Sequence, residues 1–542
     1  MNWKRLTLAL LLAGCSLASA APVDDAARMD QVVQHFVDTQ QFMGAVLVAR
    51  GDEIVFDKAC GHANLEWQIE NTPTVKFRLG SITKQFTAVS LLLLEERGKL
   101  ALGDPIKRHY PQAPPTWDAI TLQHLLTHSS GIPSFTSFPE FQKLKQFPTP
   151  VADVIALFKD KPLEFAPGEK MAYSNSGYLL LGHVIEQVSG TSDAEFVQAN
   201  IFAPLGMKDS GYDSNAQIIP HRASGYTLKG TLIENADYVH MSIPHAAGGL
   251  YSTTADLLRW QRGLYGGKLI SAASLRKLTT PYKDDYALGV FVQTKPRPSY
   301  SHGGGIEGFN TQLAYYPDSA VTVVALANLN GGAPAEIATK LAALAHGDNV
   351  KLSHERTQVS VPRQVLESYV GTYAISPQMN IMVTLEGEQL MTQASGQPRV
   401  PAFAESPTKF FLKVVDAQFE FVEAAGKISH LVLYQGGREV TAPRISDTVA
   451  TRTEITSPRE QLEQYVGTYE LQPGFDLVMK LDGSQLVLHP TGQGADRLYA
   501  EAPDRFFSKV VDATIEFNRD EEGKITQLTL TQGQFKGVAK RK

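Results

Sequence analysis

The pattern of hydrophobic and polar positions differs between the first and last parts of the chain. Between about residues 26 and 345, segments with helical and strand periodicity are interspersed. Residues 42–56, FMGAVLVARGDEIVF, are two apolar runs around a Gly-Asp pair and predict a β-hairpin. Residues 322–329, TVVALANL, predict a buried strand, and the largely apolar run 84–98, KQFTAVSLLLLEERG, predicts a buried helix that ends at its glycine.

The last part of the chain repeats itself. YVGTY occurs at residues 369–373 and 465–469, and KVVDA occurs at residues 413–417 and 509–513. In both pairs the second copy lies 96 residues after the first (465 − 369 and 509 − 413), and the spacing becomes 97 residues at Gly426 and Gly523. Each copy is too long for a solenoid repeat and long enough for a small domain.

Strand-like segments flank Glu386-Gly387 in the first copy and Asp482-Gly483 in the second. Asp-Gly between hydrophobic runs is a strong signal for a hairpin turn. We therefore expect two tandem antiparallel β-domains, either barrels or sandwiches. The predicted domains are residues 365–446 and 461–542, and the predicted linkers are residues 346–364 and 447–460.

Composition and charge restrict the classes of function. The chain has 542 residues, of which 43% are hydrophobic and 20% are charged, and its formal net charge is −6. At about 100–200 residues per domain, this length indicates three or so globular domains. A mildly acidic chain has no overall basic field, which disfavours nucleic-acid binding.

The first twenty residues resemble a targeting segment. Lys4 and Arg5 precede the apolar run LTLALLLAG. Ala18-Ser19-Ala20 fits the small-x-small site for release as a soluble protein, whereas Leu12 to Cys15 resembles a lipobox that would leave a lipid on Cys15. Both processing routes predict export to the bacterial periplasm, with membrane attachment only through a lipid on Cys15. Either route leaves Cys60 alone, so no disulfide is expected within the mature chain.

Ser81, Ile82, Thr83 and Lys84 form an S-x-x-K sequence at the start of the predicted buried helix. Serine at this place is compatible with an ordinary N-cap. However, Lys84 lies on the same face one turn later, against the helix dipole and in a site that must be partly buried. Both effects would lower the pKa of Lys84, and a neutral amine beside a hydroxyl is one way to activate a serine.

S-x-x-K alone is weak evidence, because the chain contains it three times. Ser274 and Lys277 lie in a modest helix with a cationic end, and a solvated helix face explains them. Ser406 and Lys409 have a proline between them and lie in the first β-repeat. The second repeat does not keep this pair, so we interpret it as incidental.

The context of Ser81 resembles the active-site segment of the penicillin-recognising serine hydrolases, the fold of class C β-lactamases and DD-peptidases. GSITKQFTA supplies the first motif, Tyr173-Ser174-Asn175 is similar to the Tyr-x-Asn motif, and His302-Gly303-Gly304 is similar to the third, His-x-Gly. The resemblance covers about residues 26–345. It implies an α/β catalytic domain, in which an antiparallel sheet is flanked by helices and a helical lobe carries Tyr173.

The resemblance also implies roles for these residues. Ser81 would be the nucleophile, and Tyr173, held near Lys84, would be the general base. Asn175 would bind the lysine or the substrate amide. The backbone N–H groups of Ser81 and Gly305 would form an oxyanion hole. A glycine-rich strand edge at residues 303–305 would let the substrate backbone lie close.

His302 departs from the lysine found in most β-lactamases of this shape, and a histidine is mostly neutral at pH 7. His-x-Gly is more similar to esterases and D-amino-acid peptidases. A catalytic domain followed by two related β-domains resembles bacterial D-aminopeptidases. The sequence does not decide between D-amino-acid peptides, esters and β-lactams as substrates.

Two hypotheses about function follow. The first is a serine hydrolase that works through an acyl-enzyme on a small or peptide substrate, without metal or cofactor. The alternative is a penicillin-binding sensor with little turnover. His124 and His128 have the i, i+4 spacing of metal ligands, but no acidic or cysteine partner stands nearby at ligand spacing. The oligomeric state is not indicated by the sequence.

Overall fold

The computed structural model describes residues 25–229, 232–376, 379–435, 438–447, 454–472, 474–492, 494–532 and 535–542. The predicted targeting segment with Cys15 and part of the predicted linker 447–460 lie outside these residues. The chain divides into two compact units, residues 1–350 and 351–542. The first unit has one large hydrophobic core, and the second unit has two separate cores.

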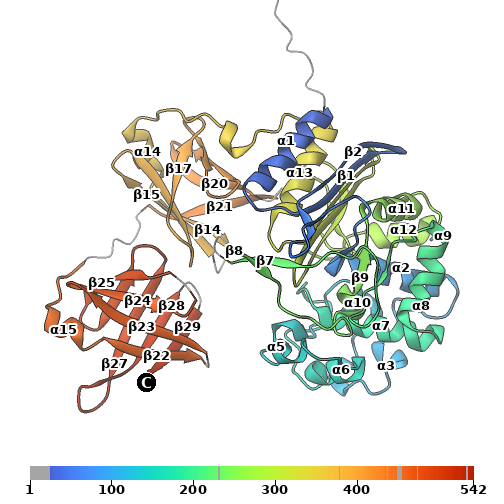
Figure 1. The fold of residues 1–542 in the computed structure, drawn as a ribbon, viewed down its shortest axis with the longest axis horizontal. Helices are drawn as coiled ribbons and strands as arrows, with labels where there is room; N and C mark the ends of the chain where they lie inside the picture. Colours follow the sequence, from blue (N-terminus) through green and yellow to red (C-terminus); the bar gives the residue numbers. More distant parts are fainter. Residues whose placement is uncertain are drawn as a thin grey trace, which may run out of the picture. The chain divides into compact units, whose positions relative to one another are not determined.

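The first unit contains both helices and strands. Its main sheet has six antiparallel strands in the order β10-β11-β12-β13-β1-β2 (Figure 1). Its strands are β1 (Gly44–Arg50), β2 (Glu53–Cys60), β10 (Phe291–Gln293), β11 (Ser299–Ile306), β12 (Phe309–Tyr316) and β13 (Val321–Ala327). The central strand β13 is buried along its whole length. The predicted hairpin and the predicted buried strand are both confirmed, and they are neighbours, because β1 pairs with β13.

Short strands complete the first unit in small sheets. These are β3 (His62–Asn64) with β4 (Ile69–Glu70), β5 (Phe77–Arg78) with β9 (Leu250–Ser252) and β6 (Gly211–Tyr212), and β7 (Tyr226–Lys229) with β8 (Leu232–Asn235). The sheet of β5, β9 and β6 lies next to the segment that carries Ser81, because Leu79 donates its N–H to the Leu250 carbonyl at 2.8 Å.

Helices cover the six-stranded sheet and form a lobe beside it. They are α1 (Asp25–Asp38), α2 (Thr83–Glu96), α3 (Ile106–His109), α4 (Leu122–Leu126), α5 (Phe141–Leu144), α6 (Val151–Lys159), α7 (Asn175–Ser189), α8 (Asp193–Val197), α9 (Ala203–Leu205), α10 (His245–Gly248), α11 (Thr254–Tyr265), α12 (Ala272–Thr279) and α13 (Ala333–Ala345). Helices α1 and α13 pack together against the sheet, and α11 packs against β1 and β13 (Figure 1).

Helix α2 is the most deeply buried helix of the first unit, since every residue from Thr83 to Leu94 is buried. Phe86 stacks on Trp260 with ring centroids 4.0 Å apart, and the Trp260 indole donates to Gln85 at 3.0 Å. A polar residue in this position needs such a partner, because an unpaired buried amide is costly. The predicted buried helix is thus confirmed, and it holds the residues that precede it against the core.

The second unit consists of two closed antiparallel barrels of eight strands each (Figure 1). The first has β14 (Gly371–Ser376), β15 (Met379–Glu386), β16 (Gln389–Ala394), β17 (Val400–Ala404), β18 (Lys409–Leu412), β19 (Ala417–Ala424), β20 (Lys427–Gln435) and β21 (Arg438–Ser446). The second has β22 (Gly467–Gln472), β23 (Phe475–Asp482), β24 (Gln485–Pro490), β25 (Asp496–Ala502), β26 (Arg505–Ser508), β27 (Ala513–Arg519), β28 (Ile525–Gln532) and β29 (Phe535–Arg541). The prediction left barrels and sandwiches open, and the structure has barrels.

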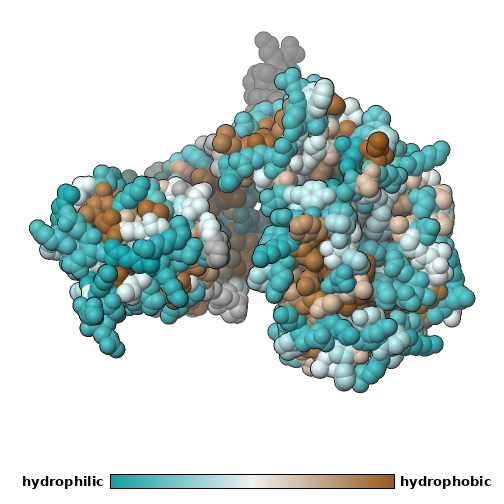
Figure 2. Space-filling view, turned by 60° about the horizontal axis from the view of Figure 1, so that its bottom comes forward, coloured by the Kyte–Doolittle hydropathy of each residue, from teal (hydrophilic) through white to brown (hydrophobic). Residues whose placement is uncertain are grey.

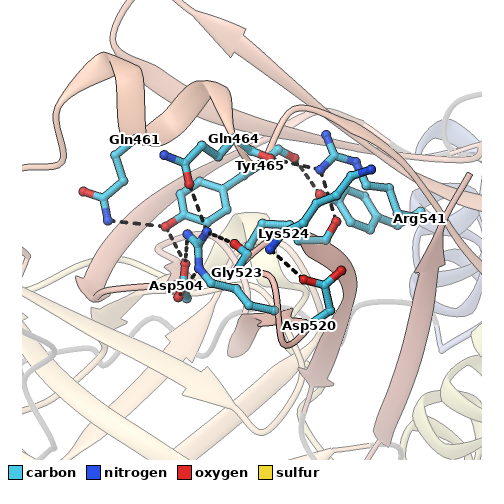
Figure 3. A network of polar contacts seen from close by, with 11 residues as sticks. Gln461, Gln464, Tyr465, Asp504, Asp520, Gly523, Lys524 and Arg541 are labelled. Atoms are coloured by element: carbon cyan, nitrogen blue, oxygen red, sulfur yellow. Dashed lines mark hydrogen bonds and ion pairs between the residues drawn. The ribbon is translucent and has the colours of Figure 1, made fainter.

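A short helix precedes each barrel, α14 (Arg363–Tyr369) in the first and α15 (Arg459–Glu463) in the second. In the second barrel, Tyr465 after this helix donates to Asp504 at 2.8 Å, and Asp504 also accepts two bonds from Arg519 (Figure 3). Arg541 on the last strand donates to the carbonyl of Val466. The matching arginine of the first barrel, Arg444, donates to the carbonyl of Val370. Both barrels therefore fix their entering segment to the last strand in the same way.

The face seen in Figure 2 is mostly hydrophilic, with separate hydrophobic patches. Apolar residues scattered in this way are ordinary for protein surfaces. Among the residues that the structure describes, no helix is long and apolar enough to cross a membrane.

Candidate active site

Ser81 lies in a 3₁₀ turn, Gly80–Ile82, directly before α2. Its side chain makes no capping bond to the helix, and the residue at the N-cap position of α2 is Ile82. The structure thus contradicts the interpretation of Ser81 as an ordinary N-cap. Ser81 instead lines a cavity of about 470 Å³ in the first unit.

Lys84 is completely buried beneath Ser81. Its amine nitrogen Nζ lies 3.1 Å from Ser81 Oγ, 2.8 Å from Asn175 Oδ1 and 2.8 Å from the Ala247 carbonyl oxygen. Burial lowers the pKa of Lys84 well below its ordinary value, because the charged form loses its hydration. The sequence-based expectation of a lowered pKa for Lys84 therefore has a structural cause.

The partners of Lys84 suit a neutral amine. An amide oxygen and a backbone carbonyl can only accept, so they take the two N–H bonds that a neutral amine possesses. The third partner, the Ser81 hydroxyl, can donate, and the nitrogen lone pair then accepts its proton. A protonated lysine would also satisfy all three contacts, but it would carry an unpaired charge in a buried site.

Asn175 begins helix α7, and its side chain is held from two sides. Its backbone N–H donates to Ser134 Oγ at 3.1 Å, and its side-chain Nδ2 donates to Thr136 Oγ1 at 3.1 Å. With Nδ2 directed to Thr136, Oδ1 faces Lys84. The 3₁₀ turn Phe135–Ser137 thus orients the amide that binds the lysine.

Tyr173 places its ring over the lysine, with the Lys84 nitrogen 4.8 Å from the ring centroid. The residue is 37% exposed overall, but desolvation of the phenol end beside Ser81 raises the pKa of Tyr173 above its ordinary value. His128 packs against the same ring with centroids 4.1 Å apart. A phenol with a raised pKa stays protonated at neutral pH, so Tyr173 is suited to donate a proton or a hydrogen bond.

His302 is buried behind the site, on strand β11. Its Nδ1 lies 2.5 Å from the Gly303 carbonyl, which can only accept, so the proton is on Nδ1. Its Nε2 faces the Tyr286 hydroxyl at 3.1 Å. Burial lowers the pKa of His302 to about 3. The imidazole is therefore neutral at physiological pH and supplies no cation for a substrate carboxylate.

Gly304 and Gly80 allow strand β11 and the 3₁₀ turn Gly80–Ile82 to approach closely. A Cβ on Gly304 would lie 1.9 Å from the Leu79 carbonyl oxygen. A Cβ on Gly80, which has a φ of +55°, would lie 2.8 Å from the Gly305 nitrogen. Only glycine fits these positions, so the structure brings Ser81 next to Gly305. This placement is what an oxyanion hole from their two N–H groups would need.

Strand β11 also presents an edge beside the cavity. Its pairing with β10 spans Ser299 to Ser301, whereas its pairing with β12 continues from Tyr300 to Ile306. Among the described residues, the edge at residues 303–305 therefore has no strand on the β10 side. An extended substrate could add to this edge through its backbone.

The structure also places the other residues considered from sequence. Lys277 forms an ion pair with Glu95 at 2.8 Å, and Ser406 Oγ accepts a hydrogen bond from the Lys409 backbone N–H. These contacts give a structural explanation for the other two S-x-x-K pairs. His124 caps helix α4, and His128 Nδ1 accepts from the Ser174 N–H at 3.1 Å. No group of three or more potential metal ligands occurs in the described part of the chain.

Sequence reasoning missed several residues of the site. Thr136 and Ser134 orient Asn175, the Ala247 carbonyl binds Lys84, and Glu307 lines the cavity. The hydroxyl-rich segment SSGIPSFTS, residues 129–137, is the signal in the sequence that points to Ser134 and Thr136.

Fold and site together define a protein of the β-lactamase and DD-peptidase class. A family model described as Beta-lactamase matches residues 29–347, more than half of the sequence, and the chain belongs to this family. A domain of unknown function (DUF3471) matches twice, at residues 355–447 and 451–539, which covers both barrels.

Similar proteins agree with this assignment. Penicillin-binding protein 4* of Bacillus subtilis (strain 168) is 30% identical over 436 residues, which are 75% of this chain and 96% of that protein. The structure of a penicillin-binding protein from Bacillus halodurans is 30% identical, with a TM-score of 0.53, and covers 59% of this chain and 98% of that one. A D-stereospecific amidohydrolase from Streptomyces sp. is 25% identical, with a TM-score of 0.50, over 56% of this chain and 94% of that one.

Proposed function

We propose that this protein is a serine hydrolase that forms an acyl-enzyme on Ser81 and acts on amides or esters. The observation that carries the proposal is the desolvated Lys84 amine, 3.1 Å from the Ser81 hydroxyl and held by two groups that only accept hydrogen bonds. This arrangement supplies a base for the serine proton without a histidine. The resemblance suggested Tyr173 as the base, but its raised pKa favours Lys84 in that role.

In the acylation step, Ser81 Oγ attacks the substrate carbonyl carbon and its proton moves to Lys84 Nζ. The carbonyl oxygen becomes an oxyanion beside the N–H groups of Ser81 and Gly305. The bond to the leaving group breaks, and the leaving group takes the proton back from Lys84 through the Tyr173 hydroxyl. Lys84 is neutral again, as its buried site requires.

In the deacylation step, water attacks the ester carbonyl and gives its proton to Lys84. The bond between the acyl carbon and Ser81 Oγ breaks, and Ser81 recovers its proton. The products are the free acid and the starting enzyme. Water must reach the acyl group for this step, and the cavity beside Ser81 is open to solvent through the half-buried residues that line it.

Substrates with a carboxylate beside the scissile bond are less favoured than neutral or cationic ones. His302 is neutral, with a pKa of about 3, and lies where a lysine would supply a positive charge. The similarity to a D-stereospecific amidohydrolase supports amides as one substrate class. The similarity to penicillin-binding proteins supports acylation by β-lactams as well, at a lower rate, because a penicillin carries a carboxylate next to its lactam nitrogen.

Intact-protein mass spectrometry tests the proposal. Wild-type protein, Ser81→Ala and Ser274→Ala are each incubated with a penicillin and with an aryl acetate, and adducts are followed over time. Ser274→Ala is the matched control, because it removes the serine of another S-x-x-K pair. We expect adducts on wild type and Ser274→Ala, and none on Ser81→Ala.

The time course separates the two hypotheses about turnover. An adduct that forms and decays indicates a hydrolase, whereas an adduct that persists with both reagents indicates a sensor with little turnover. An adduct on Ser81→Ala equal to that on wild type would refute the assignment of Ser81. We further propose export, and the mass of the mature protein would distinguish cleavage after Ala20 from a lipid on Cys15.

A further inference from the structure

The cavity beside Ser81 is lined mainly by apolar and neutral residues. Apolar lining residues include Phe135, Phe141 and Ile243, and neutral polar ones include Asn175 and Asn310. Among the described residues that line the cavity, Glu307 is the one with an ionisable acidic or basic side chain. A single carboxylate in such a lining determines which charged groups of a ligand are accepted there.

Glu307 is held in a fixed position at the turn between β11 and β12. Asn330 Oδ1 accepts from the Gly308 N–H at 2.7 Å, and Asn330 Nδ2 donates to the Ile306 carbonyl at 3.0 Å. Asn330 thus binds the backbone on both sides of Glu307. A binding group supported in this way loses little conformational entropy when it meets a ligand.

Glu307 shares one ammonium group with a second carboxylate. Lys145 Nζ lies 3.0 Å from Glu307 Oε1 and 3.3 Å from Asp237 Oδ2. The Lys145 side chain is 7% exposed and that of Glu307 is 20% exposed, so the carboxylate faces the cavity and the ammonium is behind it. Asp237 is 81% exposed and therefore well hydrated, so Glu307 is the carboxylate of this cluster that lies at the cavity.

The geometry places Glu307 on the acyl side of the scissile bond. Tyr173, which returns the proton to the leaving group, lies beside His302, with ring centroids 6.2 Å apart. The leaving group must therefore lie toward His302. Gly305 follows along β11 as the oxyanion donor, and Glu307 lies beyond it, where the cavity is. The acyl group extends into this cavity.

We propose that Glu307 is a specificity-determining residue that binds an ammonium group on the acyl part of the substrate. The inference rests on the proposed function, because it requires an acyl-enzyme on Ser81. It narrows the substrates to amides or esters of amino acids or peptides with a free amino group. Phe135, Phe141 and Ile243 in the same lining suit an apolar side chain on that amino acid.

A purely structural role for Glu307 is the competing explanation. In that case its bond to Lys145 would only join the helical lobe to the hairpin. The two explanations differ in what the Glu307→Gln variant changes: a structural role affects all substrates alike, whereas a specificity role changes the ratio between two substrates that differ in one ammonium group.

The test uses both enantiomers of phenylalanyl p-nitroanilide. Each is compared with 3-phenylpropanoyl p-nitroanilide, which has a hydrogen atom in place of the ammonium group. The measured quantity is the ratio of kcat/KM values for the two anilides. For wild type we expect at least one enantiomer to be preferred by about tenfold or more, as for a charge-assisted hydrogen bond. Glu307→Gln should lose most of this preference, and Glu307→Asp should keep part of it.

Asp237→Asn is the matched control, because it removes the other carboxylate on Lys145 but does not line the cavity. It should keep the wild-type ratio. An equal ratio in wild type and Glu307→Gln, or a wild-type preference for the anilide without the ammonium, would overturn the inference. Failure of the proposed function would look different: Ser81→Ala would hydrolyse both anilides as wild type does.

Discussion

Substitution of Gly304 by alanine tests the contact between β11 and the segment that leads into the 3₁₀ turn Gly80–Ile82. The added Cβ would lie 1.9 Å from the Leu79 carbonyl oxygen and 2.4 Å from Thr311 Oγ1, whereas real Cβ contacts are essentially never under 3.0 Å. Leu79 cannot easily move, because its carbonyl accepts from Thr311 at 2.7 Å and its N–H donates to Leu250 at 2.8 Å. The strand and the turn must therefore separate by about 1 Å.

This separation should lower both the free energy of unfolding and kcat. Overpacking of a tight contact costs about 1–3 kcal/mol of unfolding free energy. Ser81 and Gly305 move apart by a similar distance, and loss of one oxyanion donor lowers kcat by about 10²–10³-fold. With about 5–15 kcal/mol of stability in a typical domain, the variant should remain folded and yet lose most of its activity.

Gly305→Ala is the control for the stability effect. A Cβ on Gly305 meets only the side-chain nitrogen of Asn310, at 3.3 Å, and its φ is not in the left-handed region. A side-chain end can give by a few tenths of an ångström, so we expect a stability change of less than about 1 kcal/mol.

Tryptophan fluorescence is the suitable assay for unfolding. All four tryptophans of the sequence precede the second unit, and Trp117 and Trp260 are fully buried in the first. The signal therefore reports on the catalytic unit without interference from the barrels, which would otherwise complicate a single transition. The reasoning would be refuted if Gly304→Ala unfolded at the same urea concentration as wild type and kept its kcat for the aryl acetate.

Two further predictions concern charge. The folded-state pKa of Lys84 is far below its unfolded value of 10.5, so the unfolded chain binds more protons and wild-type stability should rise with pH toward 10.5. The variant Lys84→Met should not become more stable as the pH rises, and it should form no adduct. The prediction would be contradicted if the urea midpoints of wild type and Lys84→Met changed with pH in parallel. The pKa of His302 is about 3, so nitrogen NMR of labelled histidine should show a neutral imidazole with its proton on Nδ1 from pH 8 to pH 5. A protonated His302 signal at pH 6 would show that its burial is less complete.

The residues that could be predicted from the sequence are those with local patterns. Ser81 and Lys84 are three positions apart at the start of an apolar helix, and Tyr173, Asn175 and His302 stand in short motifs. The structure places the other four around Lys84 or its neighbouring rings. The hairpin turns of the barrels were equally local, since Gly387 and Gly483 have φ values of +61° and +63°.

Long-range contacts could not be predicted. The Ala247 carbonyl meets Lys84 across 163 positions, and Lys145 meets Glu307 across 162, without any repeated or periodic signal in either segment. Closure of the first barrel depends on pairing between Thr372 and Ser446, and hydrophobic alternation alone is the same in a barrel and a sandwich. The exact start of α2 at Thr83 depends on backbone geometry that a sequence pattern does not resolve.

The buried amine of Lys84 is a property of the folded chain only. In an unfolded chain the same lysine is hydrated and protonated, and the serine three positions before it has an ordinary hydroxyl. Its partners Asn175 and Ala247 come from segments 91 and 163 positions away, so the base appears only when distant parts of the first unit have come together. A chain during synthesis or unfolded for transport would therefore be chemically inert toward the esters and amides around it. Conversely, acylation of Ser81 would count the correctly folded molecules in a preparation.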